Sequence, residues 1–166
     1  MIDFHSFYVK YAGEVRRFAL LLCGNSALAD DLTSETFVRV WNSGGKIQQV
    51  TVKAYLFTIT RNLFRDHLRR QKRWADLDEG VPDTSVCLEL RAEHSEELRK
   101  TLESIQRLPE QERAALLMYA VDAMSYREIA DVLGLSLAAT KLRIYRARLK
   151  LIQASHRTVR LNGVKV

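Results

Sequence analysis

The chain has 166 residues, 47% apolar content and a formal net charge of +6, which suits one ordinary domain or two small ones and favours a polyanionic partner. No apolar run is long enough to cross a membrane, and no segment has the pattern of a signal peptide. The two cysteines, Cys23 and Cys87, are far apart and lack metal or redox spacing, so we expect free thiols in a reducing cytoplasm. The four histidines are scattered, and no nucleophile, paired-carboxylate or phosphate-loop pattern appears. We therefore expect no enzyme activity, no metal and no cofactor.

Charge is distributed unevenly along the chain. Residues 61–73 hold six basic residues and one aspartate, a net charge of +5, whereas residues 76–97 hold eight acids and one arginine, a net charge of −7. Residues 141–166 hold eight lysines or arginines and no acid, a net charge of +8. Two basic segments therefore flank an acidic one, although such charge blocks can also be solvated tails.

Helical periodicity covers most of the N-terminal half, and no convincing strand alternation is present. A first helix is expected to end at Gly24. A second helix should begin at Asn25 or Ser26, carry acids in its first turn and stop at Gly44-Gly45. A third helix should run from about Val52 to Trp74.

The second half of the chain begins with a predicted linker. Residues 75–87 contain Gly80, Pro82 and several acids. A helix is expected from about Glu89 to Arg107, and another should start at Pro109. The sequence thus predicts an all-α fold of two small helical domains joined by a flexible acidic linker.

The second helix has two contrasting faces. Leu28, Leu32, Phe37, Val40 and Trp41 are expected to face a core. The opposite face carries Asp31, Ser34, Glu35 and Arg39. Taken alone, this polar face would be an ordinary solvated surface.

The third helix interleaves aromatic and basic residues. The aromatic residues are Tyr55, Phe57, Phe64 and Trp74. The basic residues are Arg61, Arg65, Arg69, Arg70, Lys72 and Arg73. Aromatic rings stack on unpaired bases while cations hold the backbone, as expected for a single-stranded nucleic acid. The alternative is that the aromatics form a core and the cations are solvated, and the sequence leaves both interpretations open.

The stretch "SYREIADVLGLSLAATKLRIYRAR" predicts a helix-turn-helix. Ser125 and Glu128 form a capping box, Gly134 provides the turn, and Ser136 can cap the second helix. The first helix should bury Tyr126, Ile129, Ala130 and Leu133. The second helix should face inward with Leu142 or Leu137, and with Ile144, Ala147 and Leu151. Its exposed side should then carry Lys141, Arg143, Tyr145, Arg146 and Arg148. This combination of signals favours a helix that reads a DNA major groove over a plain helical hairpin, and over a helix that lies on a membrane surface.

Three stretches together resemble one family: "DDLTSETFVRVW", then "AYLFTITRNLFRDHLRR", then "LPEQERAALL" with "MSYREIADVLGLS" and "RIYRAR". They are similar to bacterial sigma factors of the sigma-70 family, extracytoplasmic-function (ECF) group. The resemblance implies region 2 over residues 1–74, an acidic linker over 75–92, region 4 over 93–154 and a basic tail over 155–166. It implies an initiation subunit that is not an enzyme, and it gives the linker a path through the polymerase cleft.

The resemblance also assigns partners and contact residues. The implied partners are core RNA polymerase, through its β′ clamp helices and β flap, double- and single-stranded promoter DNA, and an anti-sigma factor, with no small-molecule substrate. Contacts to the clamp helices are implied for Asp30, Asp31, Ser34, Glu35 and Arg39. Contacts to the −10 element are implied for Tyr55, Phe57, Arg61, Asn62, Arg65, Arg69, Arg70 and Lys72, with Asn62 at a flipped-out base. Contacts to the −35 element are implied for Ser125, Tyr126, Lys141, Leu142, Arg143, Tyr145 and Arg146.

The sequence departs from the family pattern at three places, one of which is Leu142, where a small polar residue is common. Ser34 stands where many members have glutamine, and Ala138-Ala139-Thr140 stands where members usually have Gly-Thr-Val.

Two other classes of protein remain as alternatives. A stand-alone helix-turn-helix regulator would bind duplex operators unaided, and an interaction adaptor would leave both basic segments without a role.

Overall fold

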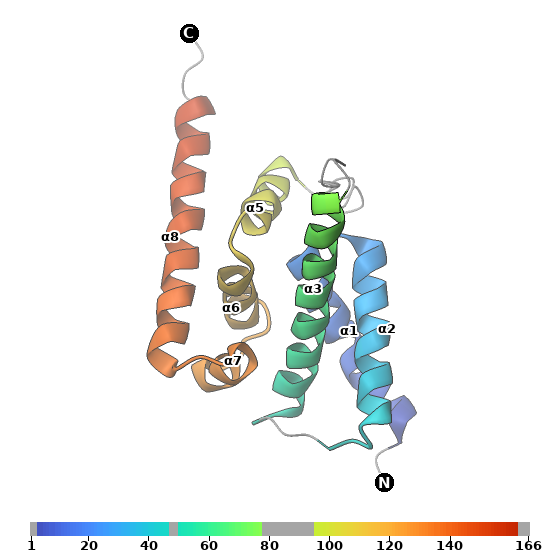
Figure 1. Ribbon diagram of the computed structural model, residues 1–166. Coiled ribbons are helices and arrows are strands. Elements are labelled where there is room, and N and C mark those ends of the chain that lie inside the picture. The colour runs from blue at the N-terminus through green and yellow to red at the C-terminus, as the bar shows by residue number, and fades with distance from the viewer. Residues whose placement is uncertain (1–2, 47–49, 78–94, 163–166) are drawn as a thin grey trace. The chain divides into compact units, whose positions relative to one another are not determined.

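The computed structural model describes residues 3–46, 50–77 and 95–162, and every regular element in these ranges is an α-helix, as predicted (Figure 1). The chain divides into two compact units, Met1–Leu88 and Glu89–Val166. Most of the predicted linker, with Cys87, falls in residues 78–94, outside the described residues. Within the described ranges, no helix is both long and apolar enough to cross a membrane.

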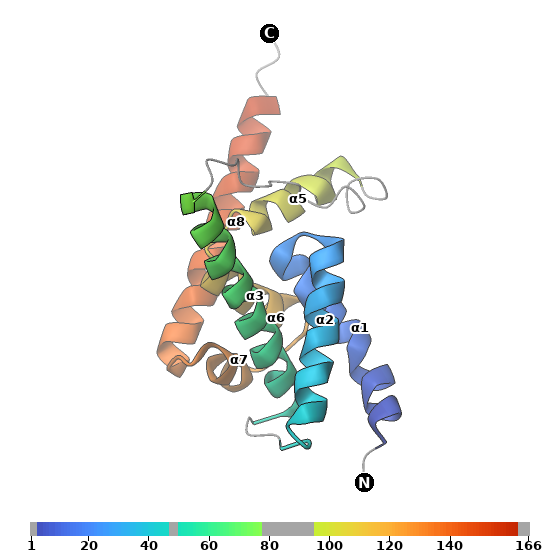
Figure 2. The same cartoon turned by 45° about the vertical axis from the view of Figure 1, so that its right-hand side comes forward.

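The described part of the first unit contains three helices that all contact one another (Figures 1 and 2). They are α1 (Phe4–Cys23), α2 (Ser26–Asn42) and α3 (Val52–Leu77). Gly24 ends α1 with a φ of 68°, and the Asn25 side chain caps α2 by accepting from the Leu28 amide, both as predicted. The first turn of α2 holds no acid, contrary to prediction, because the cap at Asn25 leaves the two aspartates at 30 and 31 in the second turn.

Aromatic stacking and one polar pair join the helices of this unit. The rings of Phe18 and Phe57, both fully buried, stack with centroids 4.2 Å apart and planes 5° from parallel. The Thr36 and Thr60 hydroxyls lie 3.0 Å apart in the core between α2 and α3. Each also donates to the carbonyl four residues back in its own helix, so both buried hydroxyls have partners.

The inward face of α2 is confirmed except at its end. Leu32, Phe37 and Val40 are buried, and Leu28 is half-buried. Trp41 was predicted to face the core, yet its side chain is 64% exposed. It lies one residue before the end of α2, where its ring meets the edge of Phe4 at a centroid distance of 4.7 Å and otherwise faces solvent.

The second unit contains four described helices: α5 (Glu96–Gln106), α6 (Glu110–Ala120), α7 (Tyr126–Leu133) and α8 (Leu137–Asn162). α8 contacts each of the other three. Leu108, Leu116 and Ala147 form a buried cluster against which Leu151 packs. Pro109 precedes α6 as predicted, and α8 continues to Asn162 through most of the segment that we expected to be a basic tail.

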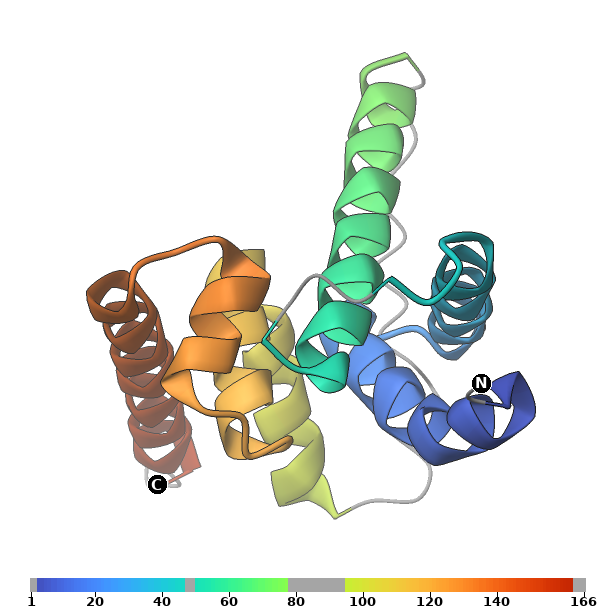
Figure 3. The same ribbon diagram turned by 90° about the horizontal axis from the view of Figure 1, so that it is seen from below.

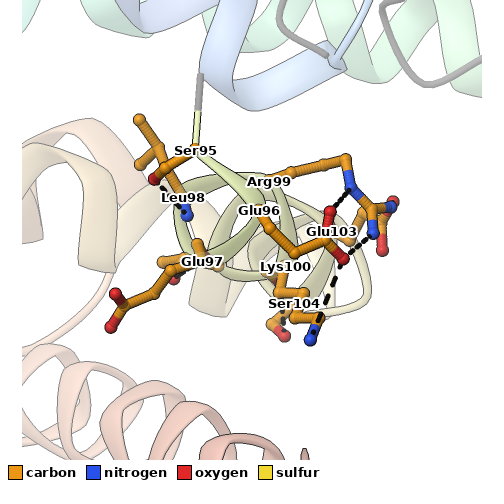
Figure 4. A network of polar contacts seen from close by, with 9 residues as sticks. Ser95, Glu96, Glu97, Leu98, Arg99, Lys100, Glu103 and Ser104 are labelled. Atoms are coloured by element: carbon orange, nitrogen blue, oxygen red, sulfur yellow. Dashed lines mark hydrogen bonds and ion pairs between the residues drawn. The ribbon is translucent and has the colours of Figure 1, made fainter.

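Polar contacts, rather than burial, dominate α5 (Figure 4). The predicted helix from Glu89 is described only from Ser95, whose hydroxyl caps the Leu98 amide. Arg99 bridges Glu96 and Glu103, one turn away on either side. No residue of α5 is fully buried, and exposed ion pairs of this kind contribute little stability.

The turn between α6 and α7 contains a strained residue. Ala123 has a φ of 50°, the one positive φ outside glycine among the described residues. Because glycine adopts this conformation without a Cβ clash, Ala123→Gly should raise the free energy of unfolding by about 0.5–1 kcal/mol. Thermal unfolding of the full chain measures this change. Ala120→Gly, at the end of α6, is the matched control and should lower stability. Equal decreases of the free energy of unfolding in both variants would contradict backbone strain at Ala123.

Candidate nucleic-acid interface

One face of α2 presents all five residues predicted to contact the clamp helices. Asp30, Asp31, Ser34, Glu35 and Arg39 are all exposed. The Arg16 guanidinium donates to Asp30 at 2.7 Å and to the Ser26 hydroxyl at 3.1 Å. Arg39 pairs with Glu35 at 3.2 Å. Among the described residues, no side-chain partner is seen for Asp31 or Ser34, so these two have polar groups available to a partner protein.

Two apolar residues extend this polar face. Val38 and Trp41 are 50% and 64% exposed. They follow Asp31 and Ser34 at three- and four-residue spacing, which places all four on one side of the helix. Val38 is not among the residues predicted from the sequence and Trp41 was predicted to face the core, although the three- and four-residue spacing was a signal for both. We call Asp31, Ser34, Glu35, Val38 and Trp41 the α2 face.

The first half of α3 is part of the core, and two residues of the predicted −10 set are buried there. Phe57 is fully buried against Phe18, and Arg61 is only 3% exposed. Neither side chain offers an accessible surface to a nucleic acid in this three-helix bundle. Phe64 is also buried, and Tyr55 is half-buried with its hydroxyl 3.2 Å from that of Ser43.

The second half of α3 leaves the bundle, and Figure 3 shows its last turns reaching past α1 and α2. Exposed side chains on this half-helix include Asn62, Arg65, Arg69, Arg70, Lys72 and Arg73. Trp74 is 71% exposed. Of the two interpretations left open, core packing therefore holds for Phe57 and Phe64, whereas Trp74 is available for stacking. Partial burial, and then the nearby Arg70, lower the pKa of His67 and so disfavour its charged form. The positive charge of this half-helix therefore comes from its arginines and Lys72.

The helix-turn-helix is present in the second unit as predicted. The Ser125 hydroxyl accepts from the Glu128 amide at 3.2 Å, and the Glu128 carboxylate accepts from the Ser125 amide at 2.8 Å. Gly134 has a φ of 64° and ends α7. The Ser136 hydroxyl accepts from the Ala139 amide at 3.1 Å and so caps α8. Both helix starts are thus fixed by side chains that their sequence positions predicted.

The first turns of α8 have a buried side and an exposed side. Thr140, Ile144 and Ala147 are buried. Leu137 and Leu142, of which one was predicted to face inward, are 50% and 46% exposed. Thr140 occupies the inward position instead, because its hydroxyl donates to the Ser136 carbonyl at 2.9 Å and its methyl group can pack.

The remaining residues of the predicted −35 set gather around the exposed side of α8. Lys141, Tyr145 and Arg146 are exposed, and Arg143 is half-buried. Ser125 is exposed at the start of α7, where Tyr126 lies beneath Lys141 with 5.3 Å between the lysine Nζ and the ring centroid. Among the described residues, no three His, Cys, Asp or Glu side chains gather closely enough to hold a metal ion.

A helix-turn-helix unit, joined in one chain to a three-helix unit with a projecting cationic helix, defines a helical protein of two functional lobes. Residues 7–74 match the Sigma-70 region 2 family, and residues 98–151 match Sigma-70, region 4. The ECF RNA polymerase sigma factor EcfG of Rhodopseudomonas palustris is 36% identical over 141 residues, covering 82% of this chain and 76% of EcfG. The chain belongs to the sigma-70 family, in its ECF group.

Two further comparisons agree with this assignment. The ECF sigma factor SigE of Mycolicibacterium smegmatis is 36% identical over 149 residues, which cover 86% of this chain and 57% of SigE. The sigma factor RpoE of Bartonella quintana, solved in complex with the anti-sigma factor NepR, superimposes with a TM-score of 0.83 at 26% identity. That comparison covers 94% of this chain and 98% of RpoE. The match to region 2 does not favour a stand-alone helix-turn-helix regulator.

Proposed function

We propose that this chain binds core RNA polymerase through the α2 face and directs it to promoters that it reads with α3 and α8. The observation that carries this proposal is the presence, in one small unit, of a partly unpaired polar and apolar face on α2 and a projecting cationic half-helix on α3. A regulator that binds only duplex DNA needs neither feature. The chain would act in the cytoplasm, where core polymerase and the chromosome are found, and it would carry out no chemistry itself.

The α2 face would dock on the clamp helices of the β′ subunit. Val38 and Trp41 offer apolar area, and aromatic residues are enriched among the residues that dominate binding energy at interfaces. Asp31 and Glu35 would confer charge complementarity, which mainly selects the partner and speeds association. Asp30 would contribute less, because its carboxylate is already paired with Arg16.

The exposed half of α3 would melt and hold the −10 element. Arg65, Arg69, Arg70 and Lys72 line a half-helix that can follow the phosphates of a separated strand. Asn62 lies at the start of this segment, and its amide can both donate to and accept from a base edge. Extruding a base costs a few kcal/mol, which these contacts, with stacking on Trp74, would offset.

The exposed side of α8 would enter the major groove at the −35 element. Lys141, Arg143 and Arg146 can reach base edges or phosphates, and Tyr145 and Leu142 can contact thymine methyl groups. Ser125 would face the backbone at the start of α7. The positions at 138–140 are occupied by small or buried side chains, so the base contacts would come from residue 141 onward.

We propose that an anti-sigma factor controls access to these surfaces. The support is the solved complex of the similar RpoE with NepR, together with the exposed apolar residues of the α2 face. An inhibitor that covers the α2 face or α8 would compete directly with polymerase or DNA. Release from such an inhibitor would expose these surfaces and would need no chemical change in this chain.

The polymerase-binding role can be tested at Asp31. Because this carboxylate has no partner within the described part of the chain, Asp31→Ala should leave stability unchanged and weaken core binding about fivefold, or ~1 kcal/mol. Titration of fluorescently labelled protein with core polymerase measures the change. Glu97→Ala removes the same charge from the exposed surface of α5 and serves as the control. Equal affinities for both variants would contradict the placement of the interface on α2.

A further inference from the structure

Two tyrosines stack on each other beside α8. The proposed function gives this pair no shared role. Tyr119 lies near the end of α6 and Tyr126 is the first residue of α7. Their ring centroids are 5.3 Å apart, and the planes are within 9° of parallel. Both residues are half-buried, so the pair forms a flat aromatic surface that remains partly accessible to solvent.

Each of these rings carries a cation from α8. The Lys141 Nζ lies 5.3 Å from the Tyr126 centroid, and the Arg148 guanidinium carbon lies 4.6 Å from the Tyr119 centroid. The two cations are seven residues apart, so they project from nearly the same side of α8, about 10 Å apart along its axis. Both distances are within the range in which a ring attracts a cation.

The pKa values of the two tyrosines shift in opposite directions. The pKa of Tyr119 is lowered, first by a hydrogen bond with the Tyr126 side chain and then by a hydrogen bond and the charge of Arg148. The pKa of Tyr126 is raised, first by the same bond with Tyr119. The two opposite shifts follow from the closeness of the two tyrosine side chains and Arg148.

The two cations lie at the border between the two sides of α8. Ile144 and Ala147 mark the buried side, and Leu142 and Tyr145 mark the exposed side. In a helix that lies in a major groove, the outermost side faces the base edges and the borders face the two sugar-phosphate backbones. A cation at such a border is therefore in a position to bind a DNA phosphate. A long side chain that is already held on an aromatic ring loses less conformational freedom when it binds a phosphate.

We propose that the Tyr119–Tyr126 stack is a platform that positions Lys141 and Arg148 to bind two phosphates of the −35 duplex. Arg148 is a phosphate-binding residue and Tyr119 is a positioning residue that acts through it. This inference rests on the proposed function, because it requires α8 to lie in the groove. It separates affinity from specificity: the platform sets the strength of binding, whereas Arg146 and its neighbours on the exposed side select the sequence.

The test measures holoenzyme binding to a duplex selected from a random-sequence pool, over a range of salt concentrations. Arg148→Ala should weaken binding about tenfold and reduce the slope of log K against log salt by about 0.9, the change for one phosphate contact. It should also weaken binding to −35 variants by the same factor. Arg107→Ala removes an exposed cation at the end of α5 and is the charge-matched control, with no change in slope.

The tyrosine variants test positioning separately from packing. Tyr119→Phe keeps the ring beneath Arg148 and should bind within about twofold of the wild type, whereas Tyr119→Leu should bind about fivefold more weakly. Tyr119→Leu should leave the salt slope unchanged, because Arg148 can still reach its phosphate at a larger entropic cost.

Two results would overturn the inference while the proposed function stands. One is an unchanged salt slope in Arg148→Ala holoenzyme, and the other is wild-type affinity in the Tyr119→Leu variant. If the leucine variant does not fold, the Arg148→Ala slope decides the question alone. Failure of the wild-type holoenzyme to select any duplex would instead contradict the proposed function and the inference together.

Discussion

Replacing Asn62 with alanine should lower the rate of open-complex formation about 10- to 100-fold, the equivalent of roughly 1.4–2.7 kcal/mol, with core binding unchanged. The side chain is exposed where α3 leaves the bundle, so its loss removes a base contact without creating a cavity. An extruded base then lacks the contact that offsets the cost of unstacking. Permanganate footprinting of unpaired thymines measures opening, and the core titration described above measures docking.

Gln71→Ala is the matched control for Asn62. Gln71 is also an exposed amide on α3, and it lies nine residues further on, two and a half turns later and hence on the opposite side of the helix. This variant should open promoters at the wild-type rate. If Asn62→Ala lowered core binding as much as opening, Asn62 would belong to the polymerase interface instead.

Removing Lys150 should cost the second unit about 2–3 kcal/mol of stability, the largest effect that we expect on folding. Its Nζ donates to the Glu112 carboxylate at 2.6 Å and ties α8 to the first turn of α6. The Glu112 side chain is only 4% exposed, so Lys150→Ala leaves a buried carboxylate without its cation. Lys150 itself is about half exposed, and water can partly replace it, which places the loss below that of a fully buried pair.

A double-mutant cycle separates the ion pair from general packing. The cycle compares Lys150→Met, Glu112→Gln and the variant that carries both. The double variant removes both charges and nearly keeps the side-chain lengths, so it should be more stable than Lys150→Met alone. Arg157→Ala removes an exposed cation from the same helix and should change stability by less than about 0.5 kcal/mol. Thermal unfolding followed by circular dichroism measures the stability of the wild type, the three variants of the cycle and the Arg157→Ala control. A double variant no more stable than the single one would show that the pair does not hold α8 in place.

Local signals predicted the parts of the fold that depend on neighbouring residues. The capping box of Ser125 and Glu128, the turn at Gly134 and the cap at Asn25 each need only a few residues of sequence, and the structure contains all three. Periodicity placed α1, α2 and α3 to within a few residues because one side of each helix must be buried.

Packing between helices decides which side chains are buried, and local signals could not predict this. Phe57 and Trp74 lie on one helix, yet only the structure reveals that the bundle covers the first and ends before the second. Trp41 is exposed because α2 ends just beyond it, and Thr140 is buried because its hydroxyl finds a carbonyl within the same turn. The stack of Tyr119 on Tyr126 joins two helices, and no spacing within either helix predicts it.

Promoter-dependent initiation is the central claim, and run-off transcription tests it most directly. Purified core polymerase would transcribe a library of genomic fragments with and without this protein, and mapping of the 5′ ends would locate the start sites. We predict discrete start sites that appear only when the protein is added, preceded by shared −10 and −35 sequences, and that are lost with Asn62→Ala. Tight unaided binding to duplex DNA, with no new start sites in the presence of core polymerase, would contradict the account.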